Sequence, residues 1–150
     1  MCVANLEDQR LLLDTHVLLW MLIGSPRMRD SPQRAAIESA AERDALSASA
    51  ISVWEITAMQ HHGVLRFAMP LEQWLEQALD SPGLRMIAID PQISFAAATL
   101  PGDFDGDFAD RCIVATARTH NRLLVTADPR IHRYAAHGYL RTIGIGKAER

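Results

Sequence analysis

The chain has little cysteine, a single lysine and no apolar segment long enough to cross a membrane. Its two cysteines, Cys2 and Cys112, form no spaced motif, which excludes a disulfide framework. Cys112 lies in an apolar helical stretch, as expected for a buried, reduced thiol in a cytoplasmic protein. The apolar run Val17–Ile23 is far too short to span a bilayer, and LEDQR at residues 6–10 interrupts any signal-peptide core. These absences predict a cytoplasmic protein with no membrane partner.

Several catalytic and metal-binding motifs are also missing. The chain has no G-x-G-x-x-G, no P-loop and no G-x-S-x-G, so nucleotide-binding folds and serine hydrolases have no support. Its six histidines include no H-E-x-x-H and it has no cysteine pairs, so zinc is not expected. The loop Asp103–Asp107 suggests a calcium loop. However, its glycine is at the fourth position, and Val114 stands where the bidentate glutamate belongs.

The composition is that of a soluble globular protein. The 150 residues are 49% hydrophobic and 22% charged, and we expect a single domain over residues 1–150. The net charge of −3 argues weakly against non-specific nucleic-acid binding. However, all basic residues except Lys147 are arginines, whose forked guanidinium suits phosphate. Six of them crowd the last third of the chain, where a solvated face and a phosphate-binding surface are both open: Arg111, Arg118, Arg122, Arg130, Arg133 and Arg141.

Short apolar runs alternate with helix-like segments. Strands are expected at residues 11–14, 45–49, 84–89, 122–127 and, last, 140–145. Helices are expected after Asp14, from Ser31-Pro32 to about Arg43, from Ile51 to His62, after Pro70, after Asp90, from Phe108 to His120 and after Asp128. Strands without a polar face indicate a sheet covered by helices on both sides. The alternation predicts an α/β fold with a parallel sheet and right-handed crossovers.

Four acidic positions lie where a strand-like run gives way to a helix-like one. They are Asp14, Glu55, Asp110 (with Asp107 just before it) and Asp128. In open α/β sheets, ligands bind outside the carboxyl ends of the strands, so we expect these acids to converge. Carboxylate and water oxygens are the ligands that Mg²⁺ and Mn²⁺ prefer. The pattern therefore predicts a divalent-metal site and a hydrolase, most plausibly one acting on phosphodiesters.

Each acid also has a structural explanation as a helix cap. Asp14 and Asp128 fit N-caps, Asp107–Asp110 fits an N-cap with its third helical residue, and Ser52 with Glu55 forms a capping-box pattern. Taken singly, the capping interpretation is the stronger one. However, serine or threonine would cap as well, so an acid at every position favours the metal site. Without metal, clustered carboxylates repel, so some should have raised pKa values and Asp128→Asn should leave the protein no less stable.

Three segments carry these acids in a specific order: LLLDTHVLLW, SASAISVWEITAMQHHGVLRF and DFADRCIVATARTHNRLLVTADP. They resemble a PIN domain, and most closely the VapC-type toxins of bacterial type II toxin–antitoxin pairs. The resemblance covers about Leu11 to Ile143. It implies a three-layer α/β/α fold around a short parallel sheet. It also implies a Mg²⁺- or Mn²⁺-dependent endoribonuclease toxin that cleaves RNA phosphodiesters with a metal-activated water.

The resemblance implies roles for the acids. The catalytic and metal-holding residues would be Asp14, Glu55, Asp110 and Asp128, with Asp107 as a further metal ligand. Related sequences often have D-P-F-D-R where this chain has D-F-A-D-R at residues 107–111. The absent proline leaves open how the first and last acids of that segment share the metal.

Three further residues are candidates for substrate binding. Thr15 and Thr126 could orient water or phosphate, and Arg111 could bind substrate or instead pair with an acid near the site. The extra acids Asp103 and Asp105 are not part of the usual pattern. A solvated loop is favoured over peripheral metal ligands for these two.

The run Val17–Ile23 leaves no polar face on its helix, so that helix is expected to be buried all round. A central core helix and a helix contacting a second subunit or another protein explain this equally well. The family resemblance favours a homodimer and a VapB-type antitoxin tail lying in a groove.

Two other functions stay open from the sequence. A haloacid-dehalogenase-like phosphatase would use Asp14 as nucleophile, but it wants a second acid where His16 stands and a lysine near the site, whereas the only lysine is Lys147. The other alternative is a non-catalytic PIN-like RNA- or protein-binding module whose acids only cap helices.

Overall fold

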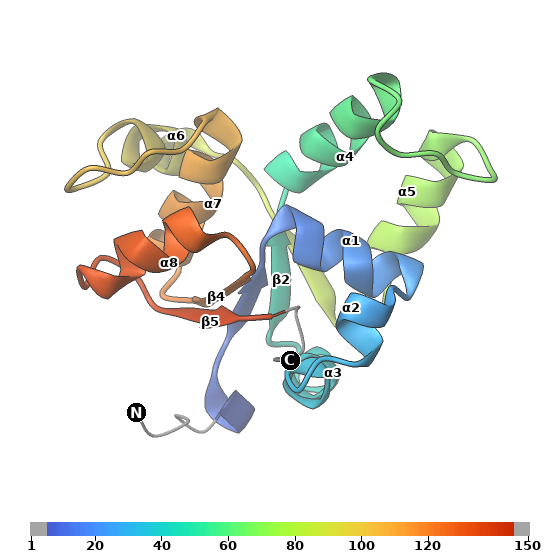
Figure 1. Cartoon of the computed structure of the whole chain (residues 1–150), viewed down its shortest axis with the longest axis horizontal. Helices are drawn as coiled ribbons and strands as arrows, with labels where there is room; N and C mark the ends of the chain where they lie inside the picture. The colour runs from blue at the N-terminus through green and yellow to red at the C-terminus, as the bar shows by residue number, and fades with distance from the viewer. Residues whose placement is uncertain (1–5, 146–150) are drawn as a thin grey trace.

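The computed structural model describes residues 6–145, and its strands form one parallel sheet (Figure 1). The strand order is β3-β2-β1-β4-β5, and every neighbouring pair is parallel. The bounds are β1 Leu11–Leu13, β2 Leu46–Ser49, β3 Leu84–Ile87, β4 Leu123–Thr126 and β5 Thr142–Gly144. Each expected strand is therefore present. Cys2 and Lys147 lie outside the described residues.

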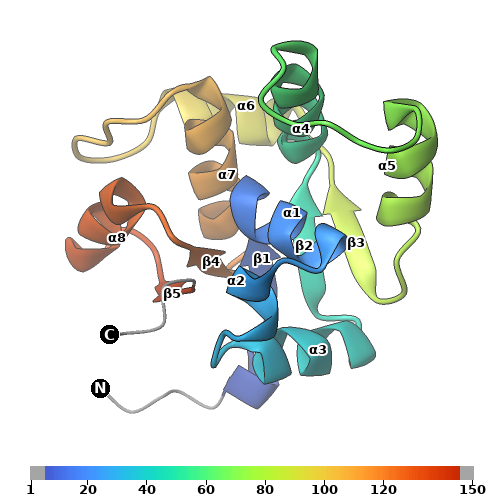
Figure 2. The same ribbon diagram turned by 45° about the vertical axis from the view of Figure 1, so that its right-hand side comes forward.

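Helices cover both faces of the sheet. After the short 3₁₀ helix η1 (Leu6–Asp8), their bounds are α1 Thr15–Ile23, α2 Pro26–Arg29, α3 Arg34–Glu42, α4 Ile51–His61, α5 Leu71–Leu79, α6 Pro91–Ala98, α7 Phe108–Thr119 and α8 Pro129–Ala136. Figure 2 shows α6, α7 and α8 on one side of the sheet and α1, α2, α3 and α5 on the other. The predicted three-layer α/β/α arrangement is confirmed.

The central strand β1 shows why two separate cores form. Leu11 and Leu13 join the core beneath α1, α2 and α3, whereas Leu12 joins the core beneath α6, α7 and α8. Successive side chains of a strand point to opposite faces, so an all-leucine strand fills both cores at once. Helix α4 contributes to both, through Ile56 on the first side and Ile51 on the second.

The sheet reverses its direction of growth at β1. The chain runs from β1 to β2 and β3 on one side, and later returns to place β4 against the other side of β1. Ligand crevices of open α/β sheets form at such a switch point, outside the carboxyl ends of the strands. Asp14 directly follows β1, and Asp128 lies two residues beyond β4.

One helix start was predicted wrongly. Ser31-Pro32 does not begin a helix, because α3 starts only at Arg34, and the Ser31 hydroxyl accepts a hydrogen bond from the Gln33 amide within a turn. Six residues earlier, the pair Ser25-Pro26 does begin a helix. There Ser25 caps α2, a helix that was not predicted, by accepting from the Arg27 amide.

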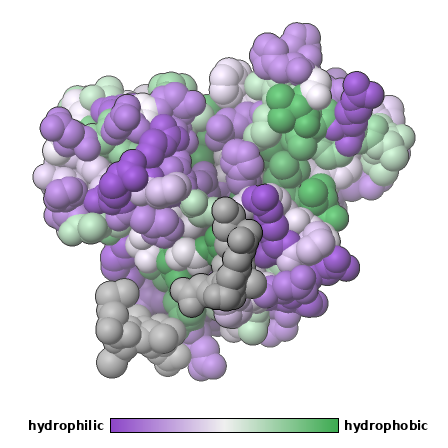
Figure 3. Space-filling model, in the orientation of Figure 1, coloured by the Kyte–Doolittle hydropathy of each residue, from purple (hydrophilic) through white to green (hydrophobic). Residues whose placement is uncertain are grey.

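Helix α1 is buried along its first half only. Val17, Leu18 and Leu19 are buried, whereas Trp20, Met21 and Leu22 are half-buried and Ile23 is 51% exposed. The central-core explanation for this helix is therefore wrong, and contact of its second half with a second subunit or another protein stays a prediction. Figure 3 shows apolar surface over α4 and toward α1. Among the described residues, none of the helices combines the length and apolar composition needed to span a bilayer.

Candidate metal centre

Asp14 and Thr126 join the ends of the two central strands. Asp14 is the N-cap of α1, where its Oδ1 accepts a 2.8 Å hydrogen bond from the Thr15 amide. Its Oδ2 accepts a 2.6 Å bond from the Thr126 hydroxyl at the end of β4. The same hydroxyl accepts from the Asp128 amide at 3.0 Å. Thr126, fully buried, thus links the first and the last predicted acids.

Thr15 brings Glu55 to the same place. The Thr15 hydroxyl donates to Glu55 Oε1 at 2.5 Å, and its oxygen lies 2.8 Å from the Ser52 hydroxyl. Helix α4 begins at Ile51, where the Ser49 hydroxyl accepts from the Ile51 amide. The predicted capping box of Ser52 with Glu55 is therefore wrong. Glu55 lies in the second turn of α4, and its carboxylate is held against α1.

Asp107 and Asp110 form a capping box at the start of α7, as the capping interpretation predicted. Asp107 accepts from the Asp110 amide at 2.9 Å, and Asp110 accepts from the Asp107 amide at 3.4 Å. The expectation that a strand precedes this site is wrong, because α7 follows a loop from α6. The position nevertheless falls at the carboxyl edge of the sheet. Helix α7 must start there in order to run back to the beginning of parallel strand β4.

Arg130 bridges two of the acids and was not predicted as a site residue. Its Nη2 donates to Oδ2 of Asp110 and to Oδ2 of Asp128, both at 2.8 Å. Its Nε and backbone amide donate to Asp128 Oδ1, at 3.3 and 2.9 Å. Its Nη1 donates to the Asp105 carbonyl at 3.2 Å. The sequence placed it among the arginines of the last third and two residues after the Asp128 N-cap, and neither feature indicates an ion pair with Asp110.

Arg111 faces backbone instead of the acids. Its Nε donates to the Ala97 carbonyl at 2.9 Å and its Nη1 to the Phe104 carbonyl at 3.2 Å. These bonds hold α7 against α6 and the connecting loop, so a role of Arg111 in binding substrate stays a prediction. Asp103 and Asp105 have exposed side chains on that loop, as expected for solvated acids.

Burial and mutual repulsion shift the pKa values of three of these acids upward. Burial raises the pKa of Asp14, although hydrogen bonds from Thr126 and Thr15 oppose the shift. Burial, followed by the charges of other acids, raises the pKa of Glu55 to about 7. Those charges are on Asp14, Asp110 and Asp107, so Glu55 lies close enough to all three carboxylates to be affected by their charge.

The remaining pair of acids differs because of Arg130. Burial and the neighbouring Asp107 charge raise the pKa of Asp110, and Arg130 only partly offsets them. Burial alone would raise the pKa of Asp128 too, but hydrogen bonds and charge from Arg130 outweigh it and leave that pKa below its usual value. Asp128 is thus the acid best neutralised by the protein itself.

Residues 11–137 match the PIN domain family. The chain belongs to the PIN domain family. Ribonuclease VapC22 of Mycobacterium tuberculosis is 35% identical over 125 residues, which cover 82% of this chain and 92% of that protein. The predicted resemblance to PIN domains of the VapC type is therefore confirmed.

Several solved structures are similar in fold to this PIN domain. VapBC2 from Rickettsia felis, bound to a promoter DNA fragment, has a TM-score of 0.65 at 17% identity and covers 90% of this chain and 98% of that chain. DNA-bound VapBC from Salmonella typhimurium has a TM-score of 0.61 at 15% identity, over 91% and 98%. A toxin–antitoxin complex from Klebsiella pneumoniae has a TM-score of 0.53 at 21% identity, over 78% and 85%. At these identities the likeness concerns the fold.

The donor atoms of the PIN-domain site suit a hard divalent cation. Carboxylates from four separate segments meet at the sheet edge, and such oxygens are what Mg²⁺ and Mn²⁺ prefer. However, within residues 6–145 no three acidic, histidine or cysteine side chains are positioned to hold a metal ion. The contacts explain this: threonine hydroxyls engage Asp14 and Glu55, and Arg130 engages Asp110 and Asp128. The carboxylate oxygens therefore suit the ion chemically, and each of these four acids has a hydrogen-bond or ion-pair partner within the protein.

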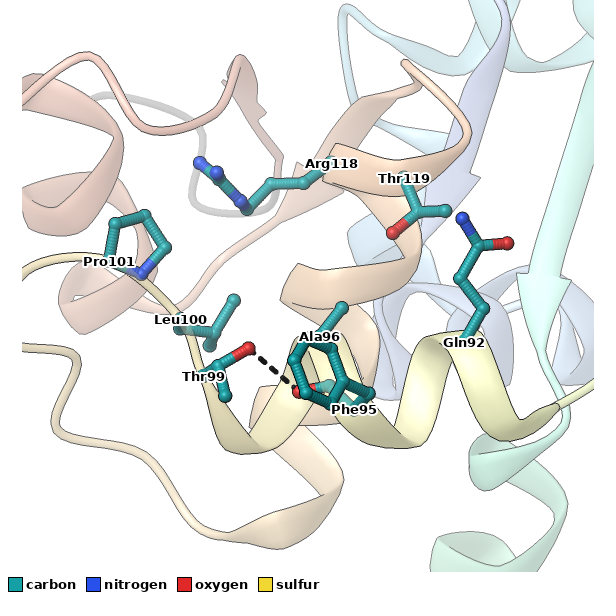
Figure 4. Close-up of a pocket in the computed structure, with 8 residues that line it drawn as sticks. All are labelled: Gln92, Phe95, Ala96, Thr99, Leu100, Pro101, Arg118 and Thr119. Carbon is teal, nitrogen blue, oxygen red and sulfur yellow. Dashed lines mark hydrogen bonds between the residues drawn. The ribbon is translucent and has the colours of Figure 1, made fainter.

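A pocket of about 370 Å³ lies away from these acids (Figure 4). Its walls come from α6, the residues after α6, and the C-terminal end of α7, where Thr119 points toward Gln92 and the Arg118 side chain extends toward Pro101. Arg118 is eight residues, or about 12 Å of helix, from Asp110. The pocket is therefore separate from the acid cluster.

Proposed function

We propose that this PIN domain is a metal-dependent endoribonuclease, the toxin of a type II toxin–antitoxin pair. The observation that carries the proposal is the convergence of Asp14, Glu55, Asp110 and Asp128 at one edge of the sheet. Helix caps alone would not need a glutamate in the second turn of α4, held by Thr15 against the first acid. The relative that is 35% identical is a ribonuclease, which fits the same chemistry.

Asp14, Asp110, Asp128 and Glu55 would hold one or two Mg²⁺ or Mn²⁺ ions, with Asp107 assisting from the start of α7. When bound, such an ion activates water and stabilises the leaving oxygen of a phosphodiester. The helix N-termini at Asp14, Asp107 and Asp128 provide partial positive charge that offsets repulsion among the carboxylates.

Thr15 and Thr126 act on the acids rather than on the RNA directly. Each donates its hydroxyl hydrogen to a carboxylate, Thr15 to Glu55 and Thr126 to Asp14. Such bonds fix which carboxylate oxygens remain free to face an ion, as partners of metal ligands commonly do. We infer a positioning role for both threonines, and a direct role in orienting water or phosphate stays a prediction.

The partners would be an RNA substrate, a VapB-type antitoxin and a second copy of the chain, in the cytoplasm. The half-buried end of α1 and the apolar surface over α4 provide a place for another polypeptide. Trp54, on α4, is 63% exposed, and Ile23, at the end of α1, is 51% exposed. Contiguous exposed apolar surface is typical of interaction sites. The relatives of known structure are toxin–antitoxin complexes.

Two experiments test this function. The purified protein should cleave a mixed RNA pool with Mn²⁺ or Mg²⁺ and stop when a chelator is added. Expression alone should arrest bacterial growth, and the cognate antitoxin should restore it. A folded protein that leaves the RNA pool intact at all metal concentrations would indicate the non-catalytic binding module. Release of phosphate from small phosphomonoesters instead would favour the phosphatase.

A further inference from the structure

Arg130 places a single nitrogen between two carboxylates that belong to different elements. Asp110 lies in the first turn of α7 and Asp128 precedes α8, yet Nη2 of Arg130 lies 2.8 Å from an oxygen of each. The side chains of Asp110 and Asp128 are 14% and 20% exposed, so these contacts are only partly screened by water. The guanidinium is therefore a positive charge of the protein in direct contact with two members of the acid cluster.

An ion held by both Asp110 and Asp128 would compete with this nitrogen for their carboxylates. Carboxylate oxygens are the ligands that Mg²⁺ prefers, so the ion would need oxygens that Arg130 now engages. A divalent ion and a guanidinium held by the same two carboxylates would also repel each other. Arg130 cannot itself act as a metal ligand, because a guanidinium has donors only.

We propose that Arg130 is an internal counter-cation that competes with the divalent ion, so that metal binding requires its guanidinium to leave Asp110 and Asp128. The inference rests on the proposed metal-dependent function. It assigns Arg130 a positioning role: it holds two metal ligands in the metal-free protein and lowers the affinity for the ion.

The local structure allows the guanidinium to move without unfolding α8. The Arg130 side chain is 41% exposed, so solvent can receive it. The backbone amide of Arg130 separately donates to Asp128 Oδ1, and this capping bond does not depend on the side chain. Asp128 would therefore stay at the helix start when the ion replaces the guanidinium. For the same reason, Arg130→Gln should keep the cap.

Arg133 provides a matched control on the same helix. It is exposed, and its charge acts on Asp128 through space, with Arg130 making the hydrogen bonds to that carboxylate. Arg133→Gln removes the same charge from α8 but leaves the bridge between the two acids intact. Comparing the two variants distinguishes the effect of the Arg130 contacts with the two acids from the longer-range electrostatic effect of a nearby positive charge.

Mn²⁺ binding to the purified full chain, measured by electron paramagnetic resonance of the free ion, tests the proposal without RNA. Arg130→Gln should bind Mn²⁺ about tenfold more tightly than the parent, because charge-assisted hydrogen bonds no longer have to be broken. Arg130→Lys, which keeps the charge but loses the fork, should gain about threefold. Arg133→Gln should change the affinity by less than about twofold, as expected for a screened surface charge.

If Arg130→Gln binds Mn²⁺ no more tightly than the parent does, the role of Arg130 as counter-cation is wrong, although the metal site itself is still supported. An equal gain in Arg133→Gln would also overturn it. If neither the parent nor Arg130→Gln binds Mn²⁺, the metal-dependent function itself fails. Circular dichroism confirms that each variant is folded, and Arg130→Lys decides the matter if Arg130→Gln is not.

Discussion

The hydroxyl of Thr126 donates a 2.6 Å hydrogen bond to Oδ2 of Asp14 and so ties the carboxyl end of β4 to that of β1. Both residues are buried, and the two strands are neighbours in the sheet. The bond crosses the point where the sheet reverses its direction of growth. The Asp14 carboxylate is therefore positioned by the sheet itself, and not only by the helix that it caps.

Replacing Thr126 by valine should destabilise the metal-free protein by about 1–3 kcal/mol, because a buried carboxylate oxygen and the Asp128 amide both lose their partner. Valine has nearly the same shape, so packing is kept. Urea unfolding in chelator measures the change. Thr126→Ser retains the hydroxyl and should lose much less. Equal stabilities of the valine variant and the parent would show that this bond contributes nothing to the fold.

Asp14→Asn and Asp110→Asn should each lower RNA cleavage by more than about a hundredfold. Mutating even a residue that only hydrogen-bonds to a metal ligand typically lowers metal affinity or activity by about 10–100-fold. Asparagine caps helices about as well as aspartate, so Asp14→Asn should remain folded. Cleavage by purified, folded variants at saturating Mn²⁺ is the measurement. Asp103→Asn, on the exposed loop, is the matched control and should keep near-normal activity. Near-normal cleavage by either site variant would remove that residue from the catalytic set.

The fold was predictable from short-range patterns because each of them has a local physical cause. Buried strands such as Leu123–Thr126 are apolar on both faces, and Asp90-Pro91 and Asp128-Pro129 mark real helix starts. The wrong start at Ser31 shows the limit of this reasoning. A Ser-Pro pair fits a helix start or a turn equally well: Ser25-Pro26 starts α2, whereas Ser31-Pro32 and Ser81-Pro82 lie at turns.

The site was only partly predictable, because its geometry depends on contacts across the fold. Asp14 and Asp128 follow predicted strands, so their convergence could be expected from topology. The direction in which Glu55 points depends on Thr15, forty residues earlier in the chain. The pairing of Arg130 with Asp110 depends on how α8 packs beside α7. Local sequence does not encode either contact.

Asp128→Asn should destabilise the metal-free protein by about 1 kcal/mol, as expected for a partly exposed ion pair with good hydrogen-bond geometry. This reverses the expectation from clustering alone, that the variant would be no less stable. The physical reason is that Arg130 leaves the pKa of Asp128 below its usual value, so its charge is favourable in the folded state. Thermal melting in chelator checks the sign, and a variant at least as stable as the parent would show that repulsion dominates.

The same variant should lose most of the stabilisation that Mn²⁺ gives the parent. An ion that binds only the folded state contributes about 2.7 kcal/mol at a hundred times its dissociation constant. Melting temperatures in rising Mn²⁺ measure the gain for each protein. If Asp128 is only a helix cap, both proteins should shift equally or not at all.

Glu55→Gln should stabilise the metal-free protein at neutral and mildly alkaline pH. The pKa of Glu55 is raised from 4.5 to about 7 in the folded state, mainly by burial and then by neighbouring acids. Between these values the folded state retains a proton that the unfolded state has released. Stability therefore falls as pH rises through this window. In chelator, the melting temperature of the parent should decline from pH 5 to pH 8 more steeply than that of Glu55→Gln. Glutamine keeps an acceptor for the Thr15 hydroxyl, so the comparison isolates the charge. Parallel pH profiles for the two proteins would show that Glu55 titrates normally and does not face the other acids.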